Sequence, residues 1–249
     1  MTNRNVSRYR EALCFHPERL AEGSVMKIEQ FSTRQEAIEF AAELFIAKAN
    51  ANPSKPVGLA TGSTMGGVYD SLASKNFVPG CAAAFALDEY LGLPEGHENS
   101  YATELTEKFS NRLGWKGSLH VPGIGVYAGS SGPAKFEQAI RDSGPISVQL
   151  LGLGTNGHIA FNEPGSAFDS VTREVELHPQ TRLDNARFFS PPESMPTHAV
   201  TQGLATIMSA TSLILIVLGE RKRPALEQAL DSPGPLTPLA PLLEHADLT

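Results

Sequence analysis

The stretch VQLLGLGTNGHIAFNEP, residues 148–164, decides the fold class that we expect for this chain. It opens with the apolar run VQLLGL, which is typical of a parallel strand covered on both faces. Its three glycines then permit tight turns and a close approach of a ligand to the backbone. Polar side chains follow within the same stretch: Asn156, His158, Asn162 and Glu163. Since open α/β sheets bind ligands at the carboxyl ends of their strands, this pattern predicts a functional site; a glycine-rich connection with a solvated histidine is the alternative.

Size and composition restrict the classes of function. A chain of 249 residues suits one α/β domain, and its formal net charge of -7 disfavours a nucleic-acid partner. The only cysteines, Cys14 and Cys81, offer neither a disulfide framework nor a metal-binding spacing, which favours a reducing compartment. The sequence contains no apolar run long enough to cross a membrane and no visible secretory signal. We therefore expect a cytoplasmic protein without a membrane partner.

Strand and helix patterns alternate along most of the chain. Predicted strands cover residues 27–31, 56–60, 81–91, 118–126, 148–153 and 212–219. Predicted helices cover residues 33–50, 99–113, 132–143 and 220–230, with a further helix opening near residue 68 and a capping turn with a short helix at 198–208. The alternation predicts a single-domain α/β fold, doubly wound and Rossmann-like, with a mainly parallel sheet and helices on both faces. Residues 165–196 are polar and predict an irregular lid segment.

The second informative stretch is GLATGST, residues 58–64, which leads from a strand into a helix. A glycine- and hydroxyl-rich turn at a helix N-terminus can bind an anion, because free N–H groups and the helix dipole point at it. Ser63 and Thr64 would then hold a phosphate group. The loop is neither a Walker A motif nor GxGxxG, and a plain strand-to-helix connection is the alternative.

Three further places carry candidate side chains. Asp88 ends a predicted buried strand and is followed by Glu89; the plain alternative is a helix-capping aspartate beside a solvated glutamate. Arg182 lies in the predicted lid, and Lys222 follows the last predicted strand. Each could bind an anion or be an ordinary solvated charge.

Together these motifs resemble the glucosamine-6-phosphate deaminase (isomerase) family. The resemblance rests on GLGTNGHIAFNEP, GLATGST, LDEYLGLP followed by ENSY, TRLDNARFF and LGERK, in that order, over about residues 26–245. Residues 1–25 stand outside the match as an N-terminal extension, and residues 26–249 would form one sugar-phosphate isomerase/deaminase domain. The related 6-phosphogluconolactonases are expected to carry arginine where this chain has Tyr90, so Tyr90 favours the deaminase branch.

The resemblance implies a reaction and a role for each candidate residue. Glucosamine 6-phosphate and water would give fructose 6-phosphate and ammonium, with no metal or other cofactor. Asp88 would be the base and His158 the ring-opening group, oriented by Asn156 and Glu163. The phosphate would be held by Ser63, Thr64, Arg182 and Lys222. A galactosamine-6-phosphate deaminase, a 6-phosphogluconolactonase and a non-catalytic sugar-phosphate sensor are the alternatives, and the sequence leaves a homo-oligomer open.

The chain departs from the family pattern in two places. Well-known members have aspartate where this chain has Asn156, which cannot carry a negative charge, so we expect a lower pKa for His158 and more reliance on Glu163. At the C-terminus, TPLAPLLEH resembles the family, but the sequence then ends at HADLT. We expect either a truncation or a differently built sheet edge, and a missing edge strand would expose unpaired backbone groups.

Overall fold

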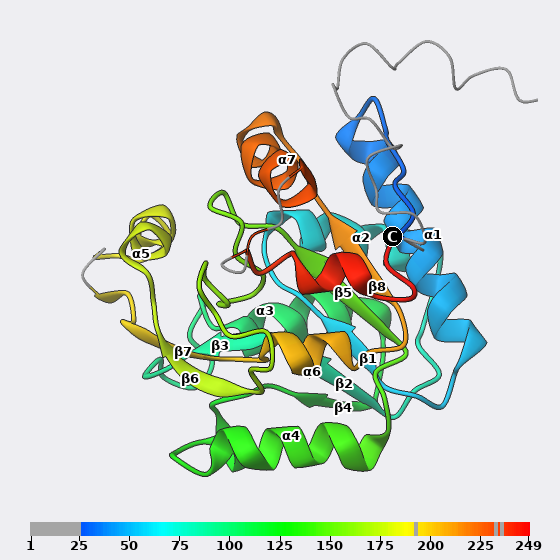
Figure 1. The fold of residues 1–249 in the computed structure, drawn as a ribbon. Coiled ribbons are helices and arrows are strands. Elements are labelled where there is room, and N and C mark those ends of the chain that lie inside the picture. Colours follow the sequence, from blue (N-terminus) through cyan, green and yellow to red (C-terminus); the bar gives the residue numbers. More distant parts are fainter. Residues whose placement is uncertain (1–25, 192–193, 232–233, 235–236) are drawn as a thin grey trace, which may run out of the picture.

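The structure is a computed structural model that describes residues 26–191, 194–231, 234 and 237–249; the predicted N-terminal extension lies outside these residues. Within them, five strands form a central sheet in the order β4–β2–β1–β5–β8 (Figure 1). All four pairings in this sheet are parallel. The strands are β1 (Val57–Leu59), β2 (Ala83–Ala86), β4 (Ser118–His120), β5 (Val148–Gly152) and β8 (Leu213–Ile216).

The strand order places a topological switch point between β1 and β5. From β1 the chain proceeds outward through β2 to β4, whereas β5 and β8 extend the sheet on the other side of β1. The loops that follow β1 and β5 therefore diverge at the carboxyl edge of the sheet, where open α/β sheets bind ligands. The predicted doubly wound, mainly parallel α/β fold is confirmed, and both glycine-rich loops lie at its switch point.

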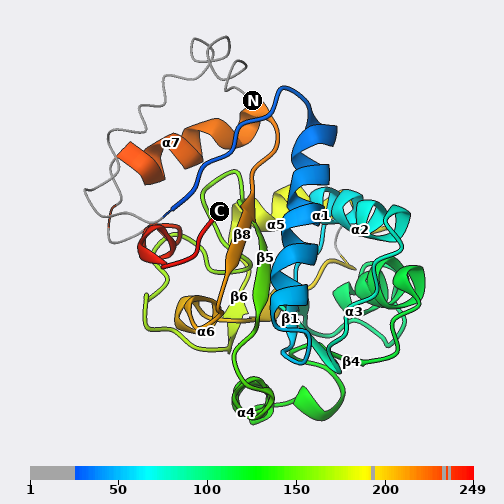
Figure 2. The ribbon, with the colours of Figure 1, turned by 90° about the vertical axis from the view of Figure 1, so that its right-hand side faces the viewer.

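Helices cover both faces of this sheet. Figure 2 shows α1 (Arg34–Ala51) and α2 (Ser63–Ser74) on one side of β1, β5 and β8, with α6 (Leu204–Met208) on the other. The predicted capping box begins α1: the Thr33 hydroxyl accepts from the Glu36 N–H at 3.2 Å, and the Glu36 carboxylate accepts from the Thr33 N–H at 3.0 Å. Among the described residues, no helix has both the length and the apolar character needed to cross a bilayer.

The remaining helical segments connect the strands. Helix α4 (Gly132–Ser143) packs on β2 through an edge-to-face contact of Phe136 with Phe85, whose ring centroids are 5.6 Å apart. The others are α3 (Tyr101–Leu105), the π-helical η2 (Thr106–Asn111), α5 (Pro179–Ala186), α7 (Arg223–Asp231) and the 3-10 turns η3 (Gly125–Tyr127), η5 (Glu220–Lys222) and η6 (Pro241–Glu244).

A second, antiparallel sheet was not predicted. It consists of β3 (Asp88–Tyr90), β7 (His198–Thr201) and β6 (Arg173–Glu176), with β7 in the middle. The predicted strand 81–91 therefore breaks at Leu87, whose N–H donates to Leu59 of β1 while its carbonyl accepts from Gln202. The predicted turn at 198–201 is a strand, and the segment 165–196, predicted to be irregular, contains β6 and α5. These strands are short and pair only with distant segments, so local periodicity does not reveal them.

The outer edge of β8 also differs from the prediction. The predicted strand at 27–31 is not formed, although the Lys27 N–H donates to the Leu248 carbonyl at 2.9 Å. Instead, the C-terminal residues lie along β8: Leu213 donates to Asp247, Thr249 donates to Leu213, and Leu215 donates to Thr249. These bonds pair backbone groups of Leu213 and Leu215, which agrees with the expected alternative of a differently built sheet edge.

Candidate active site

The loop after β1 brings a helix N-terminus to the switch point. Gly62 is the N-cap residue of α2 and has a φ of 99°, a left-handed conformation that favours glycine. Ser63 and Thr64 form the first turn of α2, where backbone N–H groups have no partner within the helix. Ser63 is exposed and Thr64 is half-buried. Both predicted phosphate-binding hydroxyls are therefore at the carboxyl edge of the sheet.

Asp88 lies at the end of the neighbouring strand, where the chain passes from β2 into β3. Its side chain is buried, with 7% exposure. Burial raises the pKa of Asp88 well above its usual value of 3.8, and the carboxylates of Glu89 and Glu104 raise it further. A carboxylate whose pKa lies closer to neutrality is a stronger general base than an exposed aspartate.

The adjacent acid, Glu89, has a structural role. It is almost fully buried, at 1% exposure. Its carboxylate accepts four hydrogen bonds of 2.7 to 3.1 Å, from the backbone N–H groups of Tyr90, Tyr101 and Ala102 and from the hydroxyl of Ser100. The bonds from Ser100, Tyr101 and Ala102 satisfy the N-terminus of α3, so the capping acid is Glu89, whereas the alternative from sequence assigned that role to Asp88.

Replacing Glu89 with alanine is expected to lower the free energy of unfolding by about 3 kcal/mol, because buried donors at the start of α3 lose their acceptor. Urea denaturation measures the change. Glu107→Ala, at an exposed position of η2, is the matched control and should stay within about 0.5 kcal/mol of the unmutated chain. Equal effects of the two substitutions would contradict the capping role.

The loop after β5 holds the imidazole of His158 against the backbone. A Cβ atom added at Gly154 would overlap the His158 ring, and the Gly154 N–H donates to the His158 carbonyl at 2.8 Å. Burial lowers the pKa of His158 below 6.5; the Glu163 carboxylate opposes this, and the ammonium of Lys222 adds to it. The imidazole is therefore neutral at pH 7, ready to accept a proton.

Asn156 contacts Glu163 rather than the imidazole ring. Its amide donates to Glu163 Oε2 at 2.7 Å, and its side-chain oxygen accepts from the backbone N–H of His158 at 3.2 Å. Glu163 Oε2 lies 3.7 Å from Nδ1 of His158, which is too long for a hydrogen bond. Nδ1 is buried and has no hydrogen-bond partner among the described residues. Asn156 can thus influence the ring only through Glu163 and the backbone.

Thr181 is a site residue that sequence reasoning missed. It is buried in α5, and its hydroxyl donates to Oε1 of Glu163. A threonine in a polar segment gives no signal of its own, because only the folded chain brings α5 to the loop after β5. Thr181 and Asn156 together hold both oxygens of the Glu163 carboxylate.

The two basic residues predicted to bind the phosphate, Lys222 and Arg182, differ in their surroundings. Lys222, at the end of η5, is half-buried and interacts with His158 and Asp184; burial lowers its pKa, and Asp184 opposes the change. Asp184 in turn accepts a hydrogen bond of 3.2 Å from Thr155. Arg182 is exposed on α5, and no hydrogen bond joins its guanidinium to the other site residues that the structure describes. Lys222 therefore interacts with the candidate residue His158, whereas Arg182 is exposed on α5.

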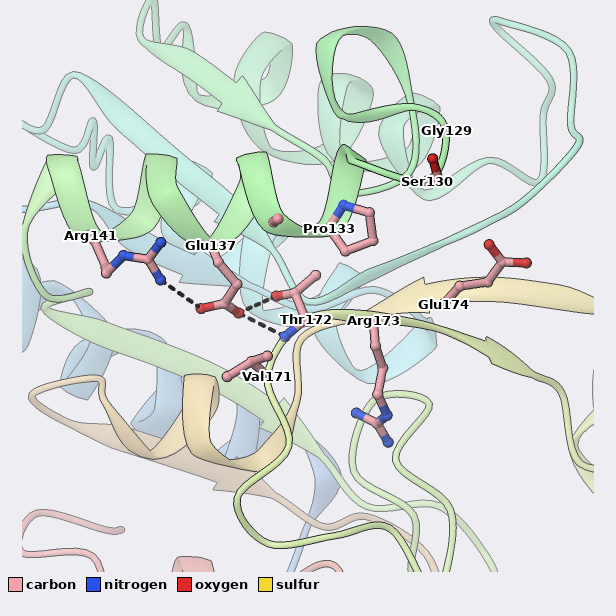
Figure 3. A pocket seen from close by; sticks show the side chains of 10 residues that line it. Gly129, Ser130, Pro133, Glu137, Arg141, Val171, Thr172, Arg173 and Glu174 are labelled. Atoms are coloured by element: carbon pink, nitrogen blue, oxygen red, sulfur yellow. Dashed lines mark hydrogen bonds and ion pairs between the residues drawn. The ribbon is translucent and has the colours of Figure 1, made fainter.

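Two cavities lie away from these residues. One, of about 530 Å³, lies between α4 and β6 (Figure 3). Its wall includes Glu137, whose carboxylate accepts from the Thr172 N–H at 2.8 Å and lies 3.9 Å from Arg141. The other, of about 580 Å³, adjoins α1, β8 and α7. Neither is lined by the predicted site residues. Within the described chain, no three His, Cys, Asp or Glu side chains gather as a metal-binding group.

Sequence comparisons identify relatives over most of the chain. The family model described as glucosamine-6-phosphate isomerases/6-phosphogluconolactonase matches residues 29–248. A protein of Corynebacterium urealyticum named glucosamine-6-phosphate deaminase is 45% identical over 192 residues, which cover 75% of this chain and 74% of the relative. A protein of Beutenbergia cavernae with the same name is 40% identical over 218 residues, covering 84% and 83%.

Solved structures agree with this grouping. A monomeric glucosamine-6-phosphate deaminase is 34% identical and superposes with a TM-score of 0.84, covering 90% of this chain and 95% of that one. A 6-phosphogluconolactonase from Shewanella baltica is 17% identical, with a TM-score of 0.68 and coverage of 91% and 98%, and shows the shared fold alone. The chain therefore belongs to the glucosamine-6-phosphate isomerase/6-phosphogluconolactonase family.

Proposed function

We propose that this chain is a glucosamine-6-phosphate deaminase, which converts glucosamine 6-phosphate and water to fructose 6-phosphate and ammonium. The observation that carries the proposal is a buried carboxylate, Asp88, and a half-buried neutral imidazole, His158, on either side of the α2 N-terminus at the carboxyl edge of the sheet. The names of the relatives at 40 to 45% identity support the same reaction.

The chemistry divides between these two groups. His158 accepts the proton of the sugar O1 hydroxyl and returns it to the ring oxygen, which opens the ring. Asp88 then removes the proton from C2, which is acidic because it adjoins the C1 aldehyde, and an enediol-type intermediate forms. Asp88 returns the proton to C1, which leaves an imine at C2. Water adds to this imine, and ammonium leaves, giving the 2-ketose phosphate. A phosphate bound at α2 aligns C1 and C2 with both groups.

The protonation states favour this division. The Asp88 base must be ionised, so activity is lost as the pH falls through its raised pKa. The His158 imidazole must be neutral to accept the O1 proton, and burial lowers its pKa so that it stays neutral down to a more acidic pH. Protonation of either group therefore lowers the activity, so both pKa values shape the acid side of the pH–rate profile.

The substrate is tested with a panel of three compounds. We expect the chain to release ammonium and fructose 6-phosphate in equal amounts from glucosamine 6-phosphate, without added metal. Turnover only of galactosamine 6-phosphate or only of 6-phosphogluconolactone would replace the proposal with the corresponding alternative. Binding of glucosamine 6-phosphate without any turnover would favour a sugar-phosphate sensor. The cytoplasmic location expected from the sequence stays a prediction.

Asn156→Asp is expected to raise the pH at which kcat/KM falls on the acid side. The new carboxylate adds negative charge beside Glu163, which favours the imidazolium form and raises the pKa of His158. A pH–rate profile measures the shift. Asn111→Asp, at an exposed position of η2, is the control and should leave the profile unchanged. An unchanged profile for Asn156→Asp would show that residue 156 does not influence the pKa of His158.

The phosphate-binding arginine is tested by comparing two arginines of the same segment. We expect Arg182→Ala to raise KM about tenfold with little change in kcat, because a bidentate phosphate contact contributes to binding before and during the reaction. Arg187, whose guanidinium carbon lies 4.8 Å from the centroid of the Phe188 ring, is the matched control. A larger rise in KM for Arg187→Ala would transfer the role to Arg187.

A further inference from the structure

One carboxylate oxygen occupies an anion position at the start of α2. Glu104 Oε1 accepts a hydrogen bond of 3.1 Å from the backbone N–H of Gly62. The same oxygen accepts from Nζ of Lys108 at 3.0 Å. Glu104 lies in α3 and Lys108 one turn later in η2, so neither belongs to the loop that they contact. An oxygen that receives one loop amide and one ammonium has the surroundings of a bound phosphate oxygen.

Lys108 reaches this position over a glycine. Gly66 lies one turn after Gly62, and its N–H donates to the Gly62 carbonyl at 3.0 Å. A Cβ added at Gly66 would stand 3.6 Å from Nζ of Lys108, so the ammonium passes over the first turn of α2. The Lys108 side chain remains 47% exposed, against 19% for Glu104, and can therefore follow a new anion more readily than Glu104 can.

We propose that Lys108 is a further phosphate-binding residue of the active site, and that Glu104 Oε1 holds the place of a substrate phosphate oxygen until the substrate displaces it. The inference rests on the proposed function, because it takes α2 as the site of the sugar 6-phosphate. A phosphate dianion carries more charge than the carboxylate and brings three acceptor oxygens, so it can take both donors from Glu104. A neutral sugar offers no comparable replacement, and the exchange therefore selects phosphorylated substrates.

The plain alternative is a surface ion pair between residues four apart, which also caps α2. Such a pair contributes little, and removing either partner should then affect the protein in the same sense. The exchange instead predicts opposite effects on phosphate binding. Without Lys108 the phosphate loses a cation, whereas without the charge of Glu104 it loses a competitor.

Titration calorimetry with inorganic phosphate separates the two accounts. We expect Lys108→Gln to weaken phosphate binding about tenfold, because the phosphate loses a charge-assisted hydrogen bond. We expect Glu104→Gln to strengthen phosphate binding about threefold, because the competing carboxylate charge is removed. The matched control is the Lys75–Glu43 pair at the other end of α2, which spans 2.9 Å; Lys75→Gln and Glu43→Gln should leave the affinity unchanged. Changes of the same sense in the Lys108 and Glu104 variants, or no change in either, would overturn the inference.

Kinetics with glucosamine 6-phosphate distinguish this inference from the proposed function. If the unmutated chain turns over the amino sugar, KM should rise for Lys108→Gln and fall for Glu104→Gln. If it does not, opposite shifts in phosphate affinity would still support the exchange at α2, and the proposed function alone would fail. If the chain turns over the amino sugar but both variants change the phosphate affinity in the same sense, the proposed function stands and Lys108 is not a phosphate-binding residue.

Discussion

Asp88→Asn is expected to lower kcat for ammonium release from glucosamine 6-phosphate at least about a thousandfold, since general-base catalysis accounts for effects of this size. Asparagine has nearly the shape of aspartate but cannot accept the C2 proton. The fold should persist, because the substitution removes a buried charge whose burial is already unfavourable, as the raised pKa of Asp88 indicates. Steady-state kinetics and urea denaturation on the same preparation separate lost catalysis from lost stability.

The matched control for this experiment is Asp70→Asn, at an exposed acid of α2 that pairs with Arg112 at 2.8 Å. It should keep kcat within about twofold, because surface ion pairs contribute little. Retention of more than a tenth of the activity in Asp88→Asn would move the base elsewhere, and Glu163 would be the next residue to test.

Gly154→Ala is expected to lower kcat about a hundredfold or more, as a misplacement of about 1 Å does in other catalytic sites. The added methyl group would overlap the imidazole ring of His158 and push it out of position. Gly154 is not in a left-handed conformation, so the effect would come from the ring and not from backbone strain. The same kinetic assay measures it, with a pH profile to follow His158.

Gly152→Ala is the control for this steric effect. Gly152 ends β5 two residues earlier, and a methyl group there would meet only Met65 Cε at 3.7 Å, an ordinary contact. We expect activity close to that of the unmutated chain. Near-normal activity in Gly154→Ala would mean that the ring tolerates displacement and that His158 does not need this position.

Much of the fold could be predicted because its central strands are short apolar runs followed by glycine. The runs at β1 and β5 indicated the parallel sheet, and the loops after them carry Ser63, Thr64 and His158 of the candidate site. The antiparallel sheet could not be predicted, because β6 reads REVE, three charged residues and one valine, which suits many exposed segments. Its pairing partner β7 lies more than twenty residues away, beyond the reach of local patterns.

The roles of neighbouring polar residues were the hardest to predict. Asp88 and Glu89 are adjacent acids, yet only the arrival of α3 makes Glu89 a buried cap and leaves Asp88 available for chemistry. Asn156 is predicted to orient His158, and its side chain binds Glu163 and the backbone N–H of His158, two contacts that the sequence spacing does not specify. Such distinctions depend on which oxygen meets which donor after folding, and sequence spacing does not contain that information.

The central claim is that the Asp88 carboxylate moves a proton from C2 to C1 before ammonium leaves. The most direct measurement uses glucosamine 6-phosphate deuterated at C2, with the product analysed by NMR. We predict fructose 6-phosphate in which deuterium has left C2 and is recovered in part at C1, because the burial of Asp88 should retard exchange of the transferred deuteron with solvent. A released hexose phosphate that still carries deuterium at C2 would show direct displacement of the amine and would contradict the account.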